Sequence, residues 1–349
     1  MGAAASMRYL RAIACVMLTV MLCRSVAAQS SNHQWRALHL LYEHETDLVT
    51  LGKQVPPLAQ LGINVIILEV DYNFDYKSHP ELRASGTPIT KAAARQFAAT
   101  CRKNGVRVIP QFQCLGHQSW KENTWPLLTK YPELDLTPGA FPGNKGLYCR
   151  EWNPLDPRVN KIVFPLMDEL IDAFQADALH VGMDEIFLIG SKQSPATYGK
   201  DPAKIFANTI NEYYAHLTRR HHVQMLMWAD RLIDGKQLQL GEWEASQAGT
   251  APAADLIPKD IILCPWHYSK KDAYPSIPYL TGKGFRVLPS SWEDVAGTAA
   301  LIEYCRAQRD DPKIIGHIFT TWSVVKVADL ATFPPLVTGL PLLRQSPAK

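Results

Sequence analysis

Two adjacent carboxylates, Asp184 and Glu185, follow directly on an apolar run of the sequence at residues 178–183. An apolar run of this length predicts a buried β-strand, and a buried sheet does not tolerate two unpaired acids. Acids at the end of such a strand are expected at an active site, because the carboxyl ends of parallel strands open onto the site in barrels. The alternative is a strand followed by an acidic helix, whose first turn Asp184 would cap.

Eight short apolar runs rich in β-branched residues recur along the chain, and polar loops follow them. They span residues 35–41, 64–70, 106–112, 178–182, 224–228, 260–265, 285–289 and 315–321. Helical patterns lie between them at residues 89–104, 159–174, 202–221 and 295–309, and a last one starts at residue 328. Alternating strands and helices predict a parallel sheet, and eight such units fill a single (β/α)8 TIM barrel of the α/β class. An open doubly wound sheet is the alternative, although no Gly-x-Gly-x-x-Gly follows any strand.

Polar and aromatic residues gather at the ends of the predicted strands. The polar ones are His39, Glu43, Glu69, Asp71, Gln111, Gln113, His117, Asp184, Glu185, Asp230, His267, Glu293 and Asp294. Four of the nine tryptophans end strands five to eight, and these are Trp228, Trp266, Trp292 and Trp322. Indole rings provide flat apolar walls for the C–H face of a sugar, and carboxylates bind its hydroxyls, so the pattern predicts a carbohydrate site.

The segment around the acid pair resembles a known family. Residues 180–185, His-Val-Gly-Met-Asp-Glu, are similar to the His-x-Gly-Gly-Asp-Glu signature of the family 20 glycoside hydrolases, the β-N-acetylhexosaminidases. Residues 108–117 and 131–134 resemble the third-strand segment of that family, and Asn153-Pro154 is typical of it as well. The resemblance extends over about residues 35–325 and is strongest in the first half.

The resemblance implies hydrolysis assisted by the substrate, a known exception to the two-carboxylate scheme of glycosidases. The 2-acetamido oxygen of the sugar attacks the anomeric carbon and forms an oxazolinium intermediate. Glu185 would protonate the leaving oxygen and later activate water, while Asp184 would hold the acetamido N–H. His117 and Asp71 would form a relay behind Glu185, and Arg36 would grip sugar hydroxyls. His180 lies within its strand, and we expect it to bond a buried backbone group.

The predicted substrate-binding set is completed by Trp228, Trp266, Tyr268, Trp292, Asp294 and Trp322. Two strand ends depart from the family pattern. The seventh strand of the family ends in Tyr-x-Asp, whose tyrosine bonds the acetamido carbonyl, whereas this chain has Trp at residue 292 and Tyr268 is the predicted substitute. The eighth strand of the family ends in Trp-x-Glu, whereas residues 322–324 read Trp-Ser-Val and lack the acid. The candidates to replace that acid are Glu43, Glu69 and Lys326.

Three other functions stay open at this point. The altered seventh and eighth strand ends fit a carbohydrate-binding barrel without turnover. A glycosidase with two ordinary carboxylates would need a second acid about 5–10 Å from Glu185. The candidates for that acid are Asp230, Asp294 and Glu69. A metal hydrolase has the least support, since His39, His117 and His180 lie on separate strands without a His-x-x-x-His pair. We therefore expect neither a metal nor a cofactor.

The N-terminal residues 1–28 have the pattern of a secretory signal. Two arginines precede an apolar stretch at residues 12–22, and small residues at 26–28 precede a predicted cleavage ahead of Gln29. The apolar stretch is too short for a stable membrane span, so we expect a secreted or periplasmic protein without an anchor. The predicted organisation is a signal peptide over residues 1–28 and one catalytic barrel over residues 29–349.

Charge and cysteine content narrow the partners further. The chain carries 36 basic and 33 acidic residues. Three of the arginines belong to the predicted signal, so the remainder is neutral and no nucleic-acid partner is expected. Outside the signal there are five cysteines, namely Cys101, Cys114, Cys149, Cys264 and Cys305. A bridge between Cys114 and Cys149 and a set of buried free thiols are both compatible with this number. The expected partner is a glycan with a terminal amino sugar, and no pattern predicts the linkage or the oligomeric state.

Overall fold

The computed structural model describes residues 34–41, 45–308, 310–322 and 325–345. The predicted signal peptide and Glu43, one candidate sugar-binding acid, lie outside these residues. Within the described part, no helix has both the length and the apolar character that a membrane crossing requires.

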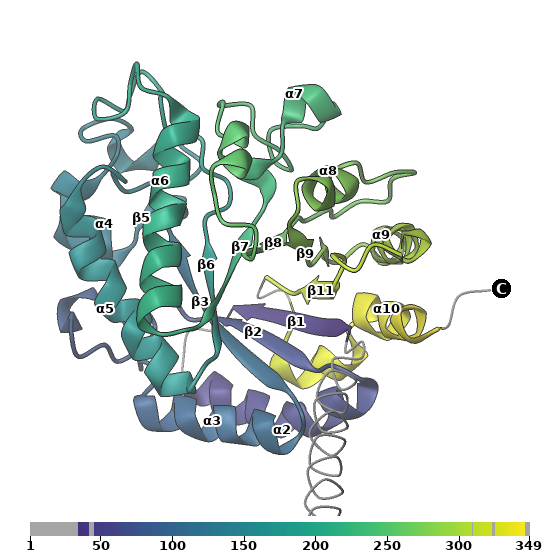
Figure 1. Cartoon of the computed structure of the whole chain (residues 1–349). Coiled ribbons are helices and arrows are strands. Elements are labelled where there is room, and N and C mark those ends of the chain that lie inside the picture. The colour runs from purple at the N-terminus through teal and green to yellow at the C-terminus, as the bar shows by residue number, and fades with distance from the viewer. Residues whose placement is uncertain (1–33, 42–44, 309, 323–324, 346–349) are drawn as a thin grey trace, which may run out of the picture. The chain divides into compact units, whose positions relative to one another are not determined.

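A ring of parallel strands forms the centre of the fold (Figure 1). The strands are β1 (Trp35–Leu41), β2 (Val65–Glu69), β3 (Arg107–Cys114), β6 (Ala178–Gly182), β7 (Gln224–Trp228), β8 (Ile262–Cys264), β9 (Arg286–Val287), β10 (Ser290–Ser291) and β11 (Gly316–Thr320). Their order in the sheet is β10-β11-β1-β2-β3-β6-β7-β8-β9, and every pair is parallel. All eight predicted runs form strands of this sheet.

The sheet closes through the seventh run, which is divided into β9 and β10. β9 pairs with β8, whereas β10 pairs with β11. The two intervening residues continue the connection, because Leu288 N donates to Leu263 O at 2.9 Å and Pro289 O accepts from Ile318 N at 2.8 Å. The first and last strands of the sheet order are therefore two halves of one strand. The prediction of a (β/α)8 barrel is confirmed, and the open doubly wound sheet is excluded.

Helices surround the strands (Figure 1). The longer ones are α2 (Glu45–Leu61), α3 (Lys91–Lys103), α5 (Pro157–Phe174), α6 (Pro202–Ala215), α8 (Ser276–Gly282), α9 (Val295–Ala307) and α10 (Pro334–Arg344). Side chains that accept from the first-turn N–H groups cap four of them, and these are Thr90, Asp156, Asp201 and Asp294. The predicted helix at residues 202–221 ends in a π-helical turn, η4 (His216–Arg220). The helix α2 was not predicted, because Pro56 and Pro57 lie inside it.

Short elements occupy the loops between the longer ones. They are a hairpin of β4 (Ser119–Trp120) and β5 (Asn123–Thr124), the helices α4 (Pro126–Lys130) and α7 (Gly235–Leu238), and the 3-10 turns η1 (Pro80–Leu82), η2 (Pro132–Leu134), η3 (Pro142–Asn144), η5 (Asp230–Leu232), η6 (Ala251–Asp255) and η7 (Val327–Thr332). The β4–β5 hairpin belongs to the loop that follows β3, at the carboxyl end of the barrel.

The barrel interior changes character along the strand direction. Near the amino ends it holds aliphatic side chains such as Ile67, Ile109 and Leu226. Because strand side chains alternate, the next inward residues lie two positions further on, and there the interior becomes polar and aromatic. These residues are His39, Glu69, Gln111, His180 and Trp228, all of them buried. The interior is therefore packed with apolar side chains near the amino ends of the strands, and the groups that can react lie towards the carboxyl ends.

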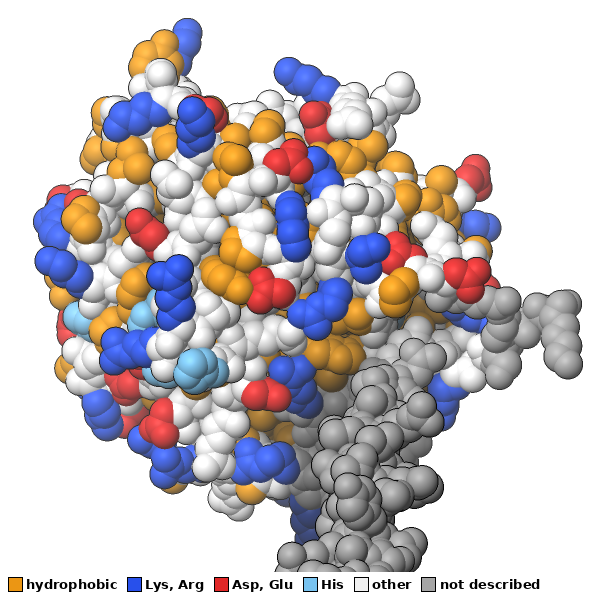
Figure 2. Space-filling model, viewed as in Figure 1, with side chains coloured by type: hydrophobic (Ala, Val, Ile, Leu, Met, Phe, Trp, Pro, Cys, Tyr) orange, Lys and Arg blue, Asp and Glu red, His pale blue; other side chains and the backbone are white. Residues whose placement is uncertain are grey.

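The surface and the cysteines bear on two further expectations. On the face that Figure 2 shows, basic and acidic side chains are interspersed, in keeping with the balanced charge of the chain outside the predicted signal.

All five cysteines are buried and free. Of the two alternatives that the cysteine number left open, the bridge between Cys114 and Cys149 is excluded and the set of buried free thiols is confirmed. Burial raises the pKa of Cys149 to about 12, so this thiol is unreactive near neutral pH.

Candidate active site

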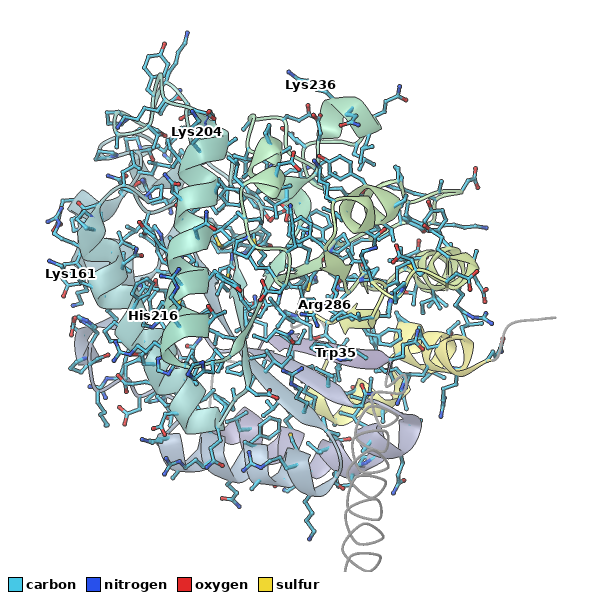
Figure 3. All side chains as sticks on the ribbon, in the orientation of Figure 1. Trp35, Lys161, Lys204, His216, Lys236 and Arg286 are labelled. Carbon is cyan, nitrogen blue, oxygen red and sulfur yellow. The ribbon has the colours of Figure 1, made fainter. Side chains whose placement is uncertain are left out.

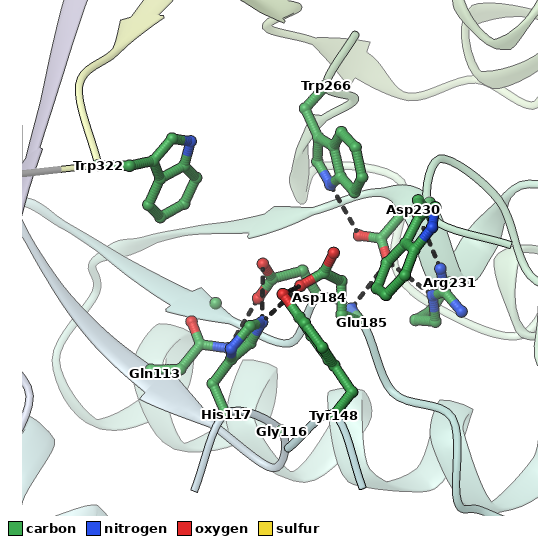
Figure 4. Close-up of polar contacts among 12 residues, drawn as sticks. Gln113, Gly116, His117, Tyr148, Asp184, Glu185, Asp230, Arg231, Trp266 and Trp322 are labelled. Carbon is green, nitrogen blue, oxygen red and sulfur yellow. Dashed lines mark hydrogen bonds and ion pairs between the residues drawn. The ribbon is translucent and has the colours of Figure 1, made fainter. Parts of the chain in front are cut away.

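The acid pair lies in the loop directly after β6, at the carboxyl end of the barrel (Figure 4). Asp184 and Glu185 are both more than nine-tenths buried. Gln113 Nε2 donates to Asp184 Oδ1 at 2.7 Å, and Tyr148 OH donates to Glu185 Oε2 at 2.7 Å. His117 Nε2 lies between the two acids, 2.9 Å from Glu185 Oε2 and 3.4 Å from Asp184 Oδ2. The structure therefore brings together three of the four predicted catalytic residues.

His117 and Asp184 each stabilise the charged form of the other. Burial alone would lower the pKa of His117, but the charge of Asp184 and the contacts with both carboxylates outweigh it and raise that pKa well above its usual value. Burial likewise acts to raise the pKa of Asp184, but the charge of His117 and the bonds from His117 and Gln113 lower it. Near neutral pH the site consequently holds an imidazolium beside an ionised Asp184.

Asp230 supports the acid pair from the end of β7. One of its oxygens, Oδ2, accepts from the backbone N of Glu185 at 2.9 Å and from Arg231 Nε at 2.6 Å. The other, Oδ1, accepts from Trp266 Nε1 at 3.3 Å. Burial raises the pKa of Asp230 to about 6, with Arg231 opposing the shift and Asp184 adding to it. Asp230 thus links the backbone at Glu185 to an aromatic wall of the site.

Left-handed backbone conformations cluster around the acids. The φ angles of Asp71, His117, Met183, Glu185 and Trp322 are 48°, 52°, 70°, 53° and 44°. Residues other than glycine seldom adopt this region, and such strain, about 1–3 kcal/mol each, gathers at functional sites. Met183 stands where the family signature has a glycine, so this chain tolerates there a conformation for which glycine is the ordinary choice.

Two glycines allow the partners of the acids to approach. A Cβ on Gly182 would lie 1.9 Å from Gln113 Oε1, which would displace the amide that holds Asp184. A Cβ on Gly116 would lie 2.5 Å from Ile186 Cδ1 and 2.9 Å from the backbone oxygen of Asp184. The loop that carries His117 can therefore reach the acid pair only because Gly116 has no side chain.

Asp71 has a different partner from the one predicted. Its Oδ1 accepts from the backbone N of Gln113 at 2.7 Å. Between the described side chains of Asp71 and His117, no hydrogen bond or ion pair is present. Burial and then the charge of Glu69 raise the pKa of Asp71 well above its usual value. The structure corrects the predicted relay: Asp71 fixes the strand that carries Gln113, and His117 contacts the acids without it.

Aromatic side chains from the last strands form walls beside the acids, and Figure 4 shows Trp266 and Trp322 on different sides of the pair. Tyr268 stacks on Trp266 with ring centroids 4.9 Å apart, and its hydroxyl accepts from Trp322 Nε1 at 2.9 Å. Trp292 packs against the Tyr268 ring at 5.5 Å. The indole N–H of Trp292 is buried and has no hydrogen-bond partner among the described residues. Four of the predicted binding residues therefore surround one space.

Three predicted binding residues lie elsewhere. Trp228 is fully buried against His39, His180 and Trp322, so it packs inside the barrel and exposes no surface to a ligand. Arg36 is wrong as a sugar ligand: it is the second residue of β1, at the opposite end of the barrel, where its Nε donates to Gly62 O.

Asp294 is likewise corrected, because both of its oxygens accept from backbone N–H groups. Oδ1 caps α9 by accepting from Ala296 N at 2.9 Å, and Oδ2 accepts from Lys270 N at 3.2 Å.

His180, by contrast, has the structural role that was expected for it. Its Nδ1 accepts from Gly182 N at 3.1 Å, and burial lowers its pKa well below the usual value.

Several residues of the site could not be found from the strand pattern. Tyr148 lies in the long loop before α5, with no periodicity to mark it, and it reaches Glu185 only in the folded chain. Glu151 is fully buried in the same loop, where Oε1 accepts from Phe187 N at 2.6 Å and from Leu188 N at 2.7 Å. The segment after Glu185 is held in place by this carboxylate.

Among the described residues, two clusters bring three potential metal-ligand atoms within 4.8 Å of one another. They are His117 with Asp184 and Glu185, and Asp168 with His216 and His221. In the first cluster a cation would compete with the proton of an imidazole whose pKa is raised well above its usual value. The donor set at the acid pair therefore favours proton chemistry over metal binding.

A closed parallel barrel with buried acids and aromatic walls at its carboxyl end defines a carbohydrate-active α/β barrel. Residues 53–323 match the model of the glycosyl hydrolase family 20 catalytic domain. The chain belongs to glycosyl hydrolase family 20.

Curated relatives carry the name β-hexosaminidase. One from Emericella nidulans is 25% identical over 274 residues, which are 69% of this chain and 40% of the relative. Another, from Akkermansia muciniphila, is 31% identical over 180 residues, which are 46% of this chain and 36% of the relative. The chain thus spans about two fifths of the length of the curated relatives it matches.

Solved structures share the fold. The chitobiase of Flavobacterium johnsoniae aligns with a TM-score of 0.63 at 19% identity, covering 89% of this chain and 48% of that one. A family 20 exo-β-N-acetylglucosaminidase of Vibrio harveyi, in complex with N-acetylglucosamine, aligns with a TM-score of 0.63 at 17% identity, covering 90% and 55%. At these identities the likeness concerns the architecture of the barrel.

Proposed function

We propose that the chain is an exo-acting β-N-acetylhexosaminidase that removes a terminal N-acetylhexosamine by a retaining, substrate-assisted mechanism. The observation that carries the proposal is the division of partners within the acid pair. Gln113 holds Asp184 and Tyr148 holds Glu185, while His117 lies between the two carboxylates. Two neighbouring acids that are held by different partners can serve two different atoms of one sugar.

In this mechanism the acetamido oxygen attacks the anomeric carbon, and the bond to the leaving oxygen breaks. Glu185 gives its proton to that oxygen, so the leaving group departs as an alcohol. The resulting carboxylate then takes a proton from water, which opens the oxazolinium ring with the β configuration retained. Asp184 accepts from the acetamido N–H and stabilises the positive charge that develops on the ring, because its lowered pKa keeps it ionised. A carboxylate has enough lone pairs to accept this bond besides the one from Gln113, while it keeps its ion pair with His117.

The unpartnered indole N–H of Trp292 supports an acetamido substrate. A buried donor without a partner is costly, and a carbonyl oxygen would satisfy it. Trp292 packs on Tyr268, whose hydroxyl already accepts from Trp322, so its indole N–H is the donor of this wall that the described residues leave unpaired. This donor would take the place of the tyrosine that the family pattern has on the seventh strand.

The two-carboxylate alternative has less support. Each candidate for a second acid has structural partners: Asp230 binds three donors, and Asp294 caps α9. Glu69 accepts from Gln111 Nε2 at 2.7 Å and lies 3.1 Å from His39 Nε2, deep in the barrel. None of these carboxylates is free to act as a nucleophile beside Glu185.

The test compares two aryl β-glycosides, one with a 2-acetamido group and one with a 2-hydroxyl, each with and without a thiazoline mimic of the oxazoline. We expect cleavage of the acetamido sugar alone and its inhibition by the thiazoline. Cleavage of the sugar with the 2-hydroxyl would contradict the substrate-assisted mechanism and indicate that a second carboxylate takes part in the reaction. Binding of the thiazoline without cleavage of either sugar would favour the barrel without turnover.

We also propose that the protein is exported. The arginines, the apolar stretch at residues 12–22 and the small residues at 26–28 support a cleaved signal. N-terminal sequencing of the protein recovered outside the cytoplasm would then begin at Gln29. Recovery of the intact N-terminus from the cytoplasm alone would contradict export.

A further inference from the structure

A second group of potential metal ligands lies outside the barrel, and we call Asp168, His216 and His221 the outer cluster (Figure 3 labels His216). His216 Nε2 and His221 Nε2 lie 2.6 Å and 2.7 Å from the same oxygen, Asp168 Oδ1. His221 comes just before β7, at the amino end of the barrel, whereas the acid pair lies at the carboxyl end. Two imidazoles and a carboxylate that converge on one point are a donor set that Zn²⁺ prefers.

The spacing of the two histidines depends on the π-helical turn η4. On an α-helix the metal pair is His-x-x-x-His, because residues four apart lie on one face. His216 and His221 are five residues apart, and on an α-helix they would lie about 140° apart around the axis. The wider π turn, with bonds from i to i+5, brings the fifth residue back to the same side. It therefore makes a ligand pair out of a spacing that a search for helical pairs does not find.

The first histidine is held in place before any ion binds. The His216 ring stacks on Phe164 of α5, with centroids 4.0 Å apart and planes inclined by 10°. One turn before His216 on α6, Glu212 Oε2 accepts from Asn160 Nδ2 of α5 at 2.5 Å. The helices that carry Asp168 and His216 are thus joined independently of the cluster. A preorganised set of ligands loses little entropy on binding an ion.

The carboxylate is oriented by a partner of its own. Arg220 Nη2 lies 3.3 Å from Asp168 Oδ2, on the oxygen that the histidines do not share. Ligating carboxylates commonly have such a second partner, which fixes their orientation. The side chains of Asp168 and His221 are partly exposed, so a cation can reach Oδ1 from solvent.

The distances within the outer cluster are those of hydrogen bonds to Oδ1. A cation at this point would replace the protons that the two imidazoles donate, and metal binding would release them. Zn²⁺ bonds of about 2.0–2.2 Å place tetrahedral ligand atoms about 3.3–3.5 Å apart. The two contacts of 2.6 Å and 2.7 Å would therefore open by less than about 1 Å, which small side-chain rotations can supply.

We propose that the outer cluster binds one Zn²⁺ ion through Asp168 Oδ1, His216 Nε2 and His221 Nε2, with water as the fourth ligand. The ion joins α5 to the connection between α6 and β7 and so stabilises this side of the barrel. The inference does not depend on the proposed function, because none of the three residues contacts the acid pair. It adds a metal site to a chain whose sequence pattern predicted none.

The experiment titrates Zn²⁺ into the chain by calorimetry, with no affinity tag and after a chelator has removed metal. Asp168→Asn, His216→Gln and His221→Gln each remove one ligand. His222→Asn is the matched control, because this exposed neighbour of His221 lies outside the cluster and asparagine tolerates its φ of 55°. His117→Gln tests whether the ion binds at the acid pair instead.

We expect one equivalent of Zn²⁺ to bind the unaltered chain. Each of the three ligand variants should lose affinity by roughly a hundredfold or more, because loss of an outer partner of a ligand alone costs about 10–100-fold. His222→Asn and His117→Gln would bind as the unaltered chain does. Absence of binding to the unaltered chain, unchanged binding by the ligand variants, or loss of binding in His117→Gln would overturn the site.

Two further measurements keep the proposal testable where a variant does not fold. Thermal unfolding without metal shows which variants are folded, and Zn²⁺ should raise the midpoint of the unaltered chain and of His222→Asn but not of the ligand variants. X-ray absorption at the zinc edge, on the loaded unaltered chain, should show two imidazole ligands. A spectrum with one imidazole or none would overturn the site without recourse to any variant.

Discussion

Among the residues that the structure describes, two clusters bring three histidine and carboxylate side chains together, and their side-chain chemistry is nearly the same. The acid-pair cluster consists of His117, Asp184 and Glu185, at the carboxyl end of the barrel. The outer cluster consists of Asp168 on α5, His216 in the turn η4 and His221 directly after that turn, outside the barrel, and Figure 3 labels His216. Both bring their ligand atoms within 4.8 Å. A search for residue types alone would rank them equally.

The balance of charge separates the two clusters. In the outer cluster both imidazoles share one carboxylate oxygen, with His216 Nε2 at 2.6 Å and His221 Nε2 at 2.7 Å from Asp168 Oδ1. Burial of His216 is the largest cause that lowers its pKa, whereas two carboxylates raise the pKa of His117. The protonated form of histidine is thus stabilised at His117 and disfavoured at His216.

The position in the fold adds the second difference. The π-helical turn brings His216 and His221, five residues apart, to one side of the chain, where His216 stacks on Phe164 at 4.0 Å. Phe164 also packs against the buried Tyr213 at 6.0 Å, so the aromatic rings at the outer cluster lie on the helices outside the strands. Similar side chains therefore acquire a catalytic arrangement only where strand ends supply acids, walls and strained backbone together.

The largest effect is expected from Glu185→Gln. Removing the acid should reduce turnover of N-acetylhexosaminides by roughly 10²–10⁴-fold, and less for substrates with good leaving groups, because these need less protonation. Steady-state rates on aryl glycosides of graded leaving-group pKa would measure this. The same loss for every leaving group would contradict the role of Glu185 as the acid. The acid-pair cluster would then no longer differ from the outer cluster in supplying a catalytic proton.

Asp184→Asn is expected to follow, with a loss of roughly 10²–10³-fold on every 2-acetamido substrate. The amide cannot supply the negative charge that the developing oxazolinium needs, whatever the leaving group. Glu185→Gln is the internal comparison, since only that variant should respond to the leaving group. Normal rates for Asp184→Asn would eliminate the substrate-assisted mechanism.

His117→Gln should reduce turnover by roughly ten- to hundredfold, below the effect of losing the acid itself. The pKa of His117 is raised in the folded state, so its stabilising effect is complete below the unfolded pKa of about 6.5 and is lost as pH rises through the folded value. Urea unfolding of the two proteins across pH should show the greatest difference at mildly acid pH and a shrinking one at alkaline pH. A difference that grows with pH would show that the histidine is not held as a cation.

Much of the fold could be predicted because periodicity is a local property. The eight strands are short apolar runs whose spacing allows only a few arrangements, and Asp184, Glu185 and His117 were found because they follow strands. Arg36 was misplaced because a local likeness to a motif does not show at which end of its strand a residue lies. It is the second residue of β1 and so lies at the amino end of the barrel, away from the acid pair.

The rest of the site depends on contacts that no local pattern encodes. Tyr148 comes from a long loop, and its hydroxyl reaches Glu185 only in the folded chain. Asp230, which Arg231 binds, holds the backbone N of Glu185 from another strand end. The role of Asp71 was misjudged because a carboxylate at a strand end can turn toward a neighbouring strand as easily as toward a histidine. Here it binds the backbone N–H of Gln113.

The smallest effect is expected from Asp168→Asn in the outer cluster, the counterpart of Asp184→Asn at the acid pair. The substitution weakens two contacts to histidine and one to Arg220, at 3.3 Å, in a partly exposed setting. Partly exposed ion pairs of this kind contribute about 0.5–1 kcal/mol, so the free energy of unfolding should fall by that amount while kcat/KM stays unchanged. Chemical denaturation and steady-state kinetics on one preparation would measure both quantities. A loss of activity beyond tenfold would mean that the outer cluster takes part in the reaction, because so small a loss of stability leaves nearly all of the protein folded.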